Sequence, residues 1–150
     1  MRAQMLAMDF PSSSLHLPPE HGPWDDEPDF AHWTDAHSGY RCMCKRTQTG
    51  AWCGYVNVPR NHPWHGLDYD EVDDKISVHG GITFANPWLA EGDWWFGFDC
   101  GHAWDIQPAL HAFLEDPETV YRDLAYVQDQ IELLALQLWA IAKGLPVDDE

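Results

Sequence analysis

Basic residues are scarce in this 150-residue chain, which has eight Lys and Arg against 25 Asp and Glu and a formal net charge of -17. Such acidity repels phosphates and excludes non-specific binding to DNA, RNA or an anionic membrane. Long apolar runs are missing too, since no stretch approaches the ~18 residues of a membrane span. The apolar patch at 3–8 is shorter than the core of a secretory signal, about 7–15 residues. We therefore expect a cytoplasmic protein.

Cysteine is sparse, and its spacing is uninformative. The four cysteines are Cys42, Cys44, Cys53 and Cys100, and none forms a C-x-x-C pair. This spacing argues against a zinc ribbon or a thioredoxin motif. In a cytoplasmic protein the cysteines are expected to be thiols or metal ligands. Walker, Rossmann, H-E-x-x-H and G-x-S-x-G motifs are also absent.

The length fits one domain, and a hydrophobic fraction of 45% with nine tryptophans argues against disorder. We expect a polar, proline-rich arm at 1–37, a single α+β domain at 38–145 and an acidic tail at 146–150. Isolated aromatic residues in the arm leave two alternatives. They pin the arm onto the domain, or the arm is a mobile tail.

The domain is predicted to contain a mostly antiparallel sheet at about 38–100. Segments 38–45 and 52–58 form two strands around a turn at 48–50, and alternation at 94–100 indicates a buried strand. Segment 76–85 resembles a hairpin turning at Gly80-Gly81, but the apolar residues on its two halves would face opposite sides. We therefore favour a loop in which paired glycines allow close approach to a ligand.

One long helix at about 117–143 is predicted to cover this sheet. Asp116 suits its N-cap and Pro117 its first turn, while Lys143 and Gly144 end it. Its apolar stripe consists of Val120, Leu124, Val127, Ile131, Leu134, Leu138 and Ile141. The favoured use of this stripe is to cover the protein's own sheet, and the alternative is a homo-oligomer formed through the helix.

Charge is unevenly distributed. The window from Ser38 to His65 has no acid and contains Arg41, Lys45, Arg46 and Arg60, so its charge is +4, while the other residues carry four bases and 25 acids, or -21. The window could attract a small anion such as a nucleotide phosphate. The alternative is that its bases pair with the protein's own acids. Interleaved aromatic residues, among them Trp52 and Tyr55, suit stacking on a base.

Reactive side chains concentrate in segments 78–81 and 97–105. In a catalytic interpretation Cys100 is a nucleophile, His79 or His102 is its base, and Asp99 or Asp105 orients that base. The amides of the paired glycines Gly80 and Gly81 would then be oxyanion donors.

Two other interpretations stay open for the same residues. His79, Cys100, His102 and Asp105 could bind zinc, with His62 or Cys53 as further ligands. Alternatively, the groups recognise a ligand without chemistry or are part of the protein's architecture.

Several strings resemble a family of small tailed-phage and prophage proteins. They are Cys-Gly-Tyr-Val-x-Val-Pro at 53–59, His62-Pro63, His-Gly-Gly-Ile-Thr-Phe at 79–84 and Trp-Trp-Phe-Gly-Phe-Asp-Cys-x-His at 94–102. The resemblance covers about 53–139, with Tyr126-Val127 matching a Tyr-Val pair near its end. Ala103-Trp104-Asp105 departs from the family's small residue and Gly-Asp. The resemblance implies an infected or lysogenic bacterial host and, by analogy, a protein that binds or cleaves nucleotide messengers of host immunity.

Together these features predict recognition of a small, phosphate-bearing, nucleotide-like ligand, either held or cleaved. The pocket is expected where His79-Gly80-Gly81 meets 99–105. The candidate phosphate contacts are Arg41, Arg46 and Arg60, and the candidate stacking groups are Trp52, Tyr55 and Trp104. One alternative is an acidic inhibitor that binds a protein partner as a nucleic-acid mimic, through the acids at 68–74. Another is a small hydrolase dependent on zinc or cysteine.

Overall fold

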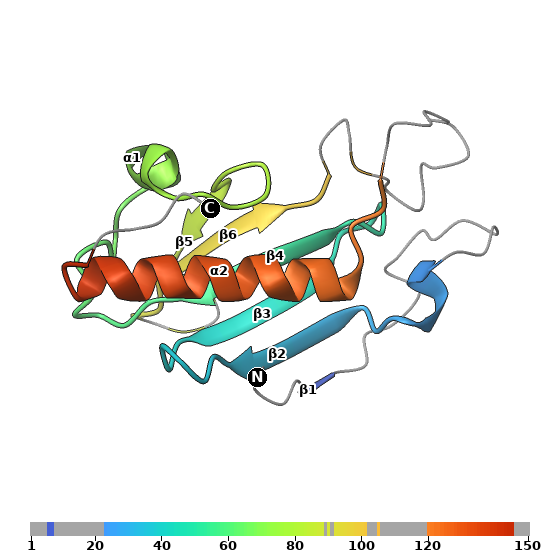
Figure 1. Cartoon of the computed structure of the whole chain (residues 1–150), viewed down its shortest axis with the longest axis horizontal. Coiled ribbons are helices and arrows are strands. Elements are labelled where there is room, and N and C mark those ends of the chain that lie inside the picture. The colour runs from blue at the N-terminus through green and yellow to red at the C-terminus, as the bar shows by residue number, and fades with distance from the viewer. Residues whose placement is uncertain are drawn as a thin grey trace.

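The computed structural model describes residues 6–7, 23–88, 90, 92–101, 105 and 120–145. In this part of the chain, six strands form one antiparallel sheet in the order β1-β2-β3-β4-β6-β5 (Figure 1). They are β1 Leu6–Ala7, β2 Phe30–Thr34, β3 Arg41–Arg46, β4 Trp52–Asn57, β5 Phe84–Asn86 and β6 Trp95–Asp99. The helices are α1 Tyr69–Val72, α2 Leu124–Ala142 and the 3-10 turns η2 Pro23–Asp26 and η3 Asp73–Lys75. The predicted α+β class is confirmed.

Helix α2 lies across one face of the sheet (Figure 1). Its apolar residues Val127, Ile131, Leu134 and Leu138 are fully buried and share a cluster with Trp52, Val56, Phe96 and Phe98. The alternation predicted for 52–58 and 94–100 is thereby confirmed, and the stripe covers the protein's own sheet. No helix in the described ranges is both long and apolar enough to cross a membrane.

The opposite face of the sheet carries an aromatic cluster. Met43, Cys53, Tyr55 and Trp95 are buried there, with Phe30, Phe84 and Trp88 packed against them. The Trp88 ring lies 4.9 Å from that of Tyr55 and 5.7 Å from that of Phe84. Lys45 places its ammonium 4.6 Å from the centroid of the Trp88 ring. Trp88 therefore covers the aromatic rings of this face and makes a cation–π contact with Lys45.

Strand β2 falls within the segment predicted as an arm. It pairs with β3 along its whole length and buries Ala31 and Trp33. The predicted boundary at residue 37 is therefore too late in the chain. The strand was not recognised because it has only five residues, two of which, His32 and Thr34, are polar, and because it closely follows Pro28.

Helix α2 begins later than predicted. Asp123 is its N-cap, and its carboxylate accepts from the N–H of Tyr126 at 2.8 Å. Residues 121–123 are not helical, so the predicted start at 117 is wrong, and Asp116 and Pro117 lie outside the described residues. The predicted end is confirmed, because the helix closes at Ala142 and Gly144 has a φ of 70°.

The Gly80-Gly81 pair does not turn a hairpin. Both glycines have positive φ, 67° and 84°, and the N–H of Gly81 donates to the carbonyl of Val78 at 2.9 Å. Strand β5 starts only at Phe84 and pairs with β6. The loop favoured over a hairpin is thus what the structure contains.

Gly54 allows α2 to approach β4 closely. A Cβ at this position would lie 2.6 Å from Cγ1 of Ile131 and 2.7 Å from the Phe98 ring. We expect Gly54→Ala to lower the free energy of unfolding by about 1–3 kcal/mol, because helix and ring must shift to accept one methyl group. Urea denaturation measures this, and unchanged stability would contradict the close approach.

The Arg46 guanidinium is a charge buried at the end of β3. Its side chain is 0% exposed, and its Nη atoms donate to the carbonyls of Trp24 and Gly50, both at 3.0 Å. Glu27 and Asp29 form ion pairs with it at 3.1 and 3.3 Å. A buried cation is tolerated only with such partners, so Arg46 fixes where the η2 segment must lie.

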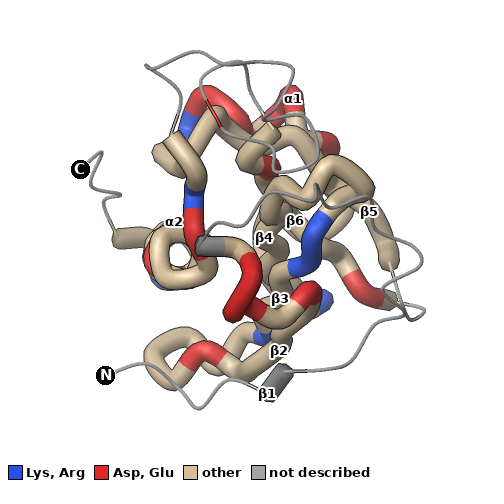
Figure 2. The backbone as a smooth tube through the Cα atoms, turned by 90° about the vertical axis from the view of Figure 1, so that its right-hand side faces the viewer, with Lys and Arg blue, Asp and Glu red and all other residues tan. Residues whose placement is uncertain are grey.

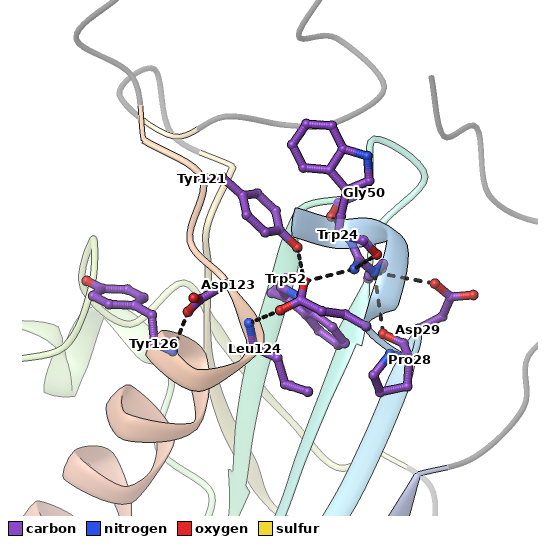
Figure 3. A network of polar contacts seen from close by, with 11 residues as sticks. Trp24, Pro28, Asp29, Gly50, Trp52, Tyr121, Asp123, Leu124 and Tyr126 are labelled. Carbon is purple, nitrogen blue, oxygen red and sulfur yellow. Dashed lines mark hydrogen bonds and ion pairs between the residues drawn. The ribbon is translucent and has the colours of Figure 1, made fainter. Parts of the chain in front are cut away.

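Glu27 extends this network to the start of α2 (Figure 3). One carboxylate oxygen accepts from Arg46, from the Trp52 indole at 3.4 Å and from the hydroxyl of Tyr121. The other accepts from the N–H of Leu124 at 2.6 Å. Burial and this carboxylate raise the pKa of Tyr121, which therefore stays a neutral donor.

We expect Glu27→Ala to destabilise the protein by about 3–5 kcal/mol, because it leaves the buried Arg46 without its main carboxylate and removes a cap from α2. The exposed neighbour Asp26 provides the control, since Asp26→Asn should stay within about 0.5 kcal/mol of the parent. Thermal or urea denaturation compares the two. Equal stabilities would mean that the network contributes nothing.

Candidate functional site

His79, which precedes the paired glycines, is the centre of a buried polar chain. Its Nε2 lies 2.9 Å from Oδ2 of Asp105, and its Nδ1 lies 2.7 Å from the hydroxyl of Tyr126. The carboxylate can only accept, so Nε2 carries the proton and Nδ1 accepts from the tyrosine. We call the chain Asp105–His79–Tyr126 the relay.

Arg122 completes the site. Its Nε donates to Oδ1 of Asp105 at 3.1 Å, and its guanidinium carbon lies 4.8 Å from the centroid of the Tyr126 ring. The Asp105 side chain is 0% exposed, whereas that of Arg122 is 25% exposed. The buried carboxylate thus has a partner on each oxygen, and the arginine reaches from it to the surface.

The loop that carries His79 is tied down on several sides. The N–H of His79 donates to Oε1 of Gln130 at 2.8 Å, and Gln137 exchanges two hydrogen bonds with the backbone of Ser77 at 2.9 and 2.7 Å. These side chains come from α2, which also supplies Tyr126. The imidazole and the hydroxyl are therefore held against each other by one helix.

Of the two predicted oxyanion donors, Gly80 and Gly81, the amide of Gly81 is already engaged. The N–H of Gly81 donates to Val78, and that of Ile82 donates to Oδ1 of Asp73 at 2.8 Å. A Cβ at Gly81 would lie 2.5 Å from the same Asp73 oxygen. The glycine pair therefore accommodates the protein's own Asp73 carboxylate.

Cys100 is a core residue in this structure. It is 1% exposed and belongs to the cluster beneath α2. Burial, reinforced by the Asp105 charge, raises the pKa of its thiol, which stays neutral. Burial likewise raises the pKa of Cys53 to about 11 and of Cys44 to about 12. A nucleophile needs a thiolate, so these cysteines do not suit that role.

Among the described residues, no group of three or more His, Cys, Asp or Glu side chains is arranged to hold a metal ion, so the zinc interpretation has no support from them. Of the four predicted ligands, His102 lies outside the described residues.

His62, named as a further ligand, lies away from His79. Its Nε2 is 2.7 Å from the Leu138 carbonyl, and its Nδ1 accepts from the N–H of Trp64 at 2.9 Å. Leu138 is roughly 18 Å along α2 from Tyr126. His62 therefore cannot join the relay.

His62 makes stability depend on pH. Burial lowers its pKa below the ordinary value, so the folded state resists a proton that the unfolded chain accepts near pH 6.5. Stability is then full above that pH and falls as the pH drops, by at most about 1.4 kcal/mol per pH unit for this one proton. Urea denaturation from pH 7.5 to 5.5 should show this slope, reduced in His62→Asn. An equal slope in both proteins would contradict it.

The acid-free window does not face the relay. Arg41 pairs with Asp93 at 2.9 Å, and Arg46 is buried on Glu27, so the alternative of pairing with the protein's own acids holds for both. The sheet register places Arg41 opposite Asn57, at the far end from Asp99. That end is roughly 13–17 Å away along the strands.

Other predicted ligand contacts also fall away from the relay. Arg60 lies against Gly92, where a Cβ would meet its guanidinium, at the same far end of the sheet. Trp52 is 0% exposed, and Tyr55 is buried in the aromatic cluster with Trp88. Arg46 and Trp52 are therefore corrected to core roles. Trp104 lies outside the described residues.

An open pocket of about 560 Å³ lies at the relay end of the sheet. It is lined by Thr47, Gln48, Thr49, Ala51, Cys53, Asp99 and Gly101. Asp99 accepts from the Thr83 hydroxyl at 3.1 Å and from the N–H of Gly101 at 3.0 Å. Cys53 and Asp99 belong to the face of the sheet opposite α2, whereas the relay lies against α2. The pocket and the relay therefore lie at the same end of the sheet but on opposite faces.

The structure brings together His79 and Asp105, which sequence reasoning named, with Arg122 and Tyr126, which it missed. The available signal was the Tyr-Val pair at 126–127, noted only as a family marker. No family model, curated protein or solved structure matches this chain.

Proposed function

We propose that this protein recognises a small, phosphate-bearing, nucleotide-like ligand, with Arg122 as its principal anion contact. The proposal is based on the hydrogen bonding of the Arg122 guanidinium. Its Nε is fixed on Asp105, while its terminal amino groups have no hydrogen-bond partner among the described residues. A guanidinium held on one side offers a rigid pair of donors, the arrangement that suits a phosphate.

Two further features support the proposal. The Tyr126 ring, whose centroid lies 4.8 Å from the guanidinium carbon of Arg122, helps to hold that guanidinium in place. The net charge of -17 favours a small ligand over a long polyanion.

The resemblance to phage proteins suggests which nucleotides to consider. We propose that the ligand is a nucleotide messenger of bacterial immunity, which the protein would bind or cleave in the host cell. Cyclic dinucleotides and mononucleotides are therefore the probes for the binding experiment.

We expect nucleotides to raise the thermal midpoint of the wild-type protein, and Arg122→Lys to weaken their binding at least ~10-fold, or about 1.4 kcal/mol. Lysine keeps the charge beside Asp105 but loses the paired donors. Arg60→Gln, at the far end of the sheet, is the matched control and should bind as the wild type does. Differential scanning fluorimetry and calorimetry measure both. Absence of stabilisation by every nucleotide tested would refute the proposal.

A second candidate function rests on the acids of α1 and η3. Asp68, Asp70, Glu71, Asp73 and Asp74 are exposed along one margin of the molecule (Figure 2). Such a surface would let the protein inhibit a nucleic-acid-binding partner as a mimic. Asp70→Asn with Asp74→Asn would then abolish inhibition and Arg122→Lys would not, the reverse of the outcome expected for the ligand site.

A further inference from the structure

We propose that Tyr126 is a nucleophile that cleaves small phosphodiesters, with His79 as its general base and Asp105 positioning that base. The inference rests on the proposed function, because Arg122 must first hold the phosphate of the ester. It gives Tyr126 the role of nucleophile, which the sequence had suggested for Cys100.

The relay has the order of a catalytic triad, hydroxyl to imidazole to carboxylate. The distance from the Tyr126 hydroxyl to Nδ1 of His79, 2.7 Å, is within the reach required of a general base, about 2.6–3.2 Å. The distance from Nε2 to Asp105, 2.9 Å, fixes the tautomer that leaves Nδ1 able to accept a proton. The two ring planes of His79 and Tyr126 are nearly perpendicular, at 89°.

The environment of the hydroxyl explains why a base is needed. Burial raises the pKa of Tyr126, so the phenolate does not form unaided. Tyr126 is nevertheless only partly buried, unlike His79 and Asp105. Tyr126 is therefore the member of the relay closest to solvent, and its ring lies against the guanidinium of Arg122, whose side chain is 25% exposed.

The substrate class follows from charge. A phosphodiester carries one negative charge, which the guanidinium of Arg122 can match, whereas a monoester dianion would bring a second charge close to Asp105. Arg122 would also stabilise charge that builds on the phosphoryl oxygens in the transition state. A small diester is favoured because the rest of the chain repels an extended one.

The chemical step balances without a metal or another cofactor. The Tyr126 oxygen bonds to phosphorus, its proton passes to Nδ1 of His79, and the bond to the leaving oxygen breaks. The departing alkoxide takes a proton from water and leaves hydroxide. Hydroxide attacks the phosphotyrosine, the bond to Tyr126 breaks, and His79 returns its proton to the tyrosine. The net products are an alcohol and a phosphomonoester.

Bis(4-nitrophenyl) phosphate tests this step, because each cleavage releases coloured 4-nitrophenolate. We expect release by the wild type, and intact-protein and peptide mass spectrometry of quenched samples to locate a 4-nitrophenyl phosphate adduct on Tyr126. Tyr126→Phe should lose the adduct and at least ~100-fold of the rate. Tyr69→Phe, an exposed tyrosine on α1, is the matched control and should keep both.

Three outcomes separate this inference from the proposed function. Nucleotide binding without any release of nitrophenolate would overturn the catalytic role and leave recognition standing. Release that persists in Tyr126→Phe would mean that water, not the tyrosine, attacks phosphorus. Failure of both binding and release would refute both proposals. The adduct is sought on the wild-type protein, so the test holds even if the variant is unstable, and thermal unfolding reports that.

Discussion

The buried charge of Arg46 constrains more of this molecule than any other group. A guanidinium removed from water requires a carboxylate, and Glu27 supplies it from a segment that precedes the sheet. The same carboxylate binds Tyr121 and Leu124, which flank Arg122 in the chain. The position of Arg122 in the chain, next to Tyr121, therefore depends on the buried charge of Arg46 through the carboxylate of Glu27.

The ion pairs at the two ends of the sheet differ in their surroundings. At one end Arg41 pairs with Asp93 near the surface, and at the other Asp105 is buried between Arg122 and His79. Only the second arrangement holds a carboxylate out of water beside groups that can move a proton. A chain with a net charge of -17 thus still holds a partly exposed guanidinium, that of Arg122, which we propose as an anion contact.

Periodicity predicted the parts of the fold that repeat. The alternation in β4 and β6 and the apolar stripe of α2 each involve enough residues to stand out. Strand β2 was missed because its five residues follow Pro28 and include polar His32 and Thr34. The start of α2 was misplaced because Asp116-Pro117 has the chemistry of a helix start, and so does Asp123, which is the cap.

The candidate site was predictable only in part, for a geometric reason. His79 and Asp105 stand out because they sit among glycines, but Arg122 and Tyr126 look like ordinary residues at the start of a helix. Their role depends on contacts across 17 and 47 positions of the chain. Likewise, the sequence shows that Arg41 and Arg46 are basic but not that their charge is used internally. Composition gives the number of charged residues, and only the fold shows which of them are paired inside the protein.

The contacts of Glu27 with Tyr121 and Leu124 span 94 and 97 positions, and this has a consequence for biosynthesis. Strands β2, β3 and β4 leave the ribosome well before α2, since translation proceeds at about 5–20 residues per second. For several seconds the nascent sheet exposes Trp52 and Val56 and holds an arginine without its complete network. Contacts of such long sequence separation form slowly, so the sheet can bury its apolar face only after the last helix has emerged.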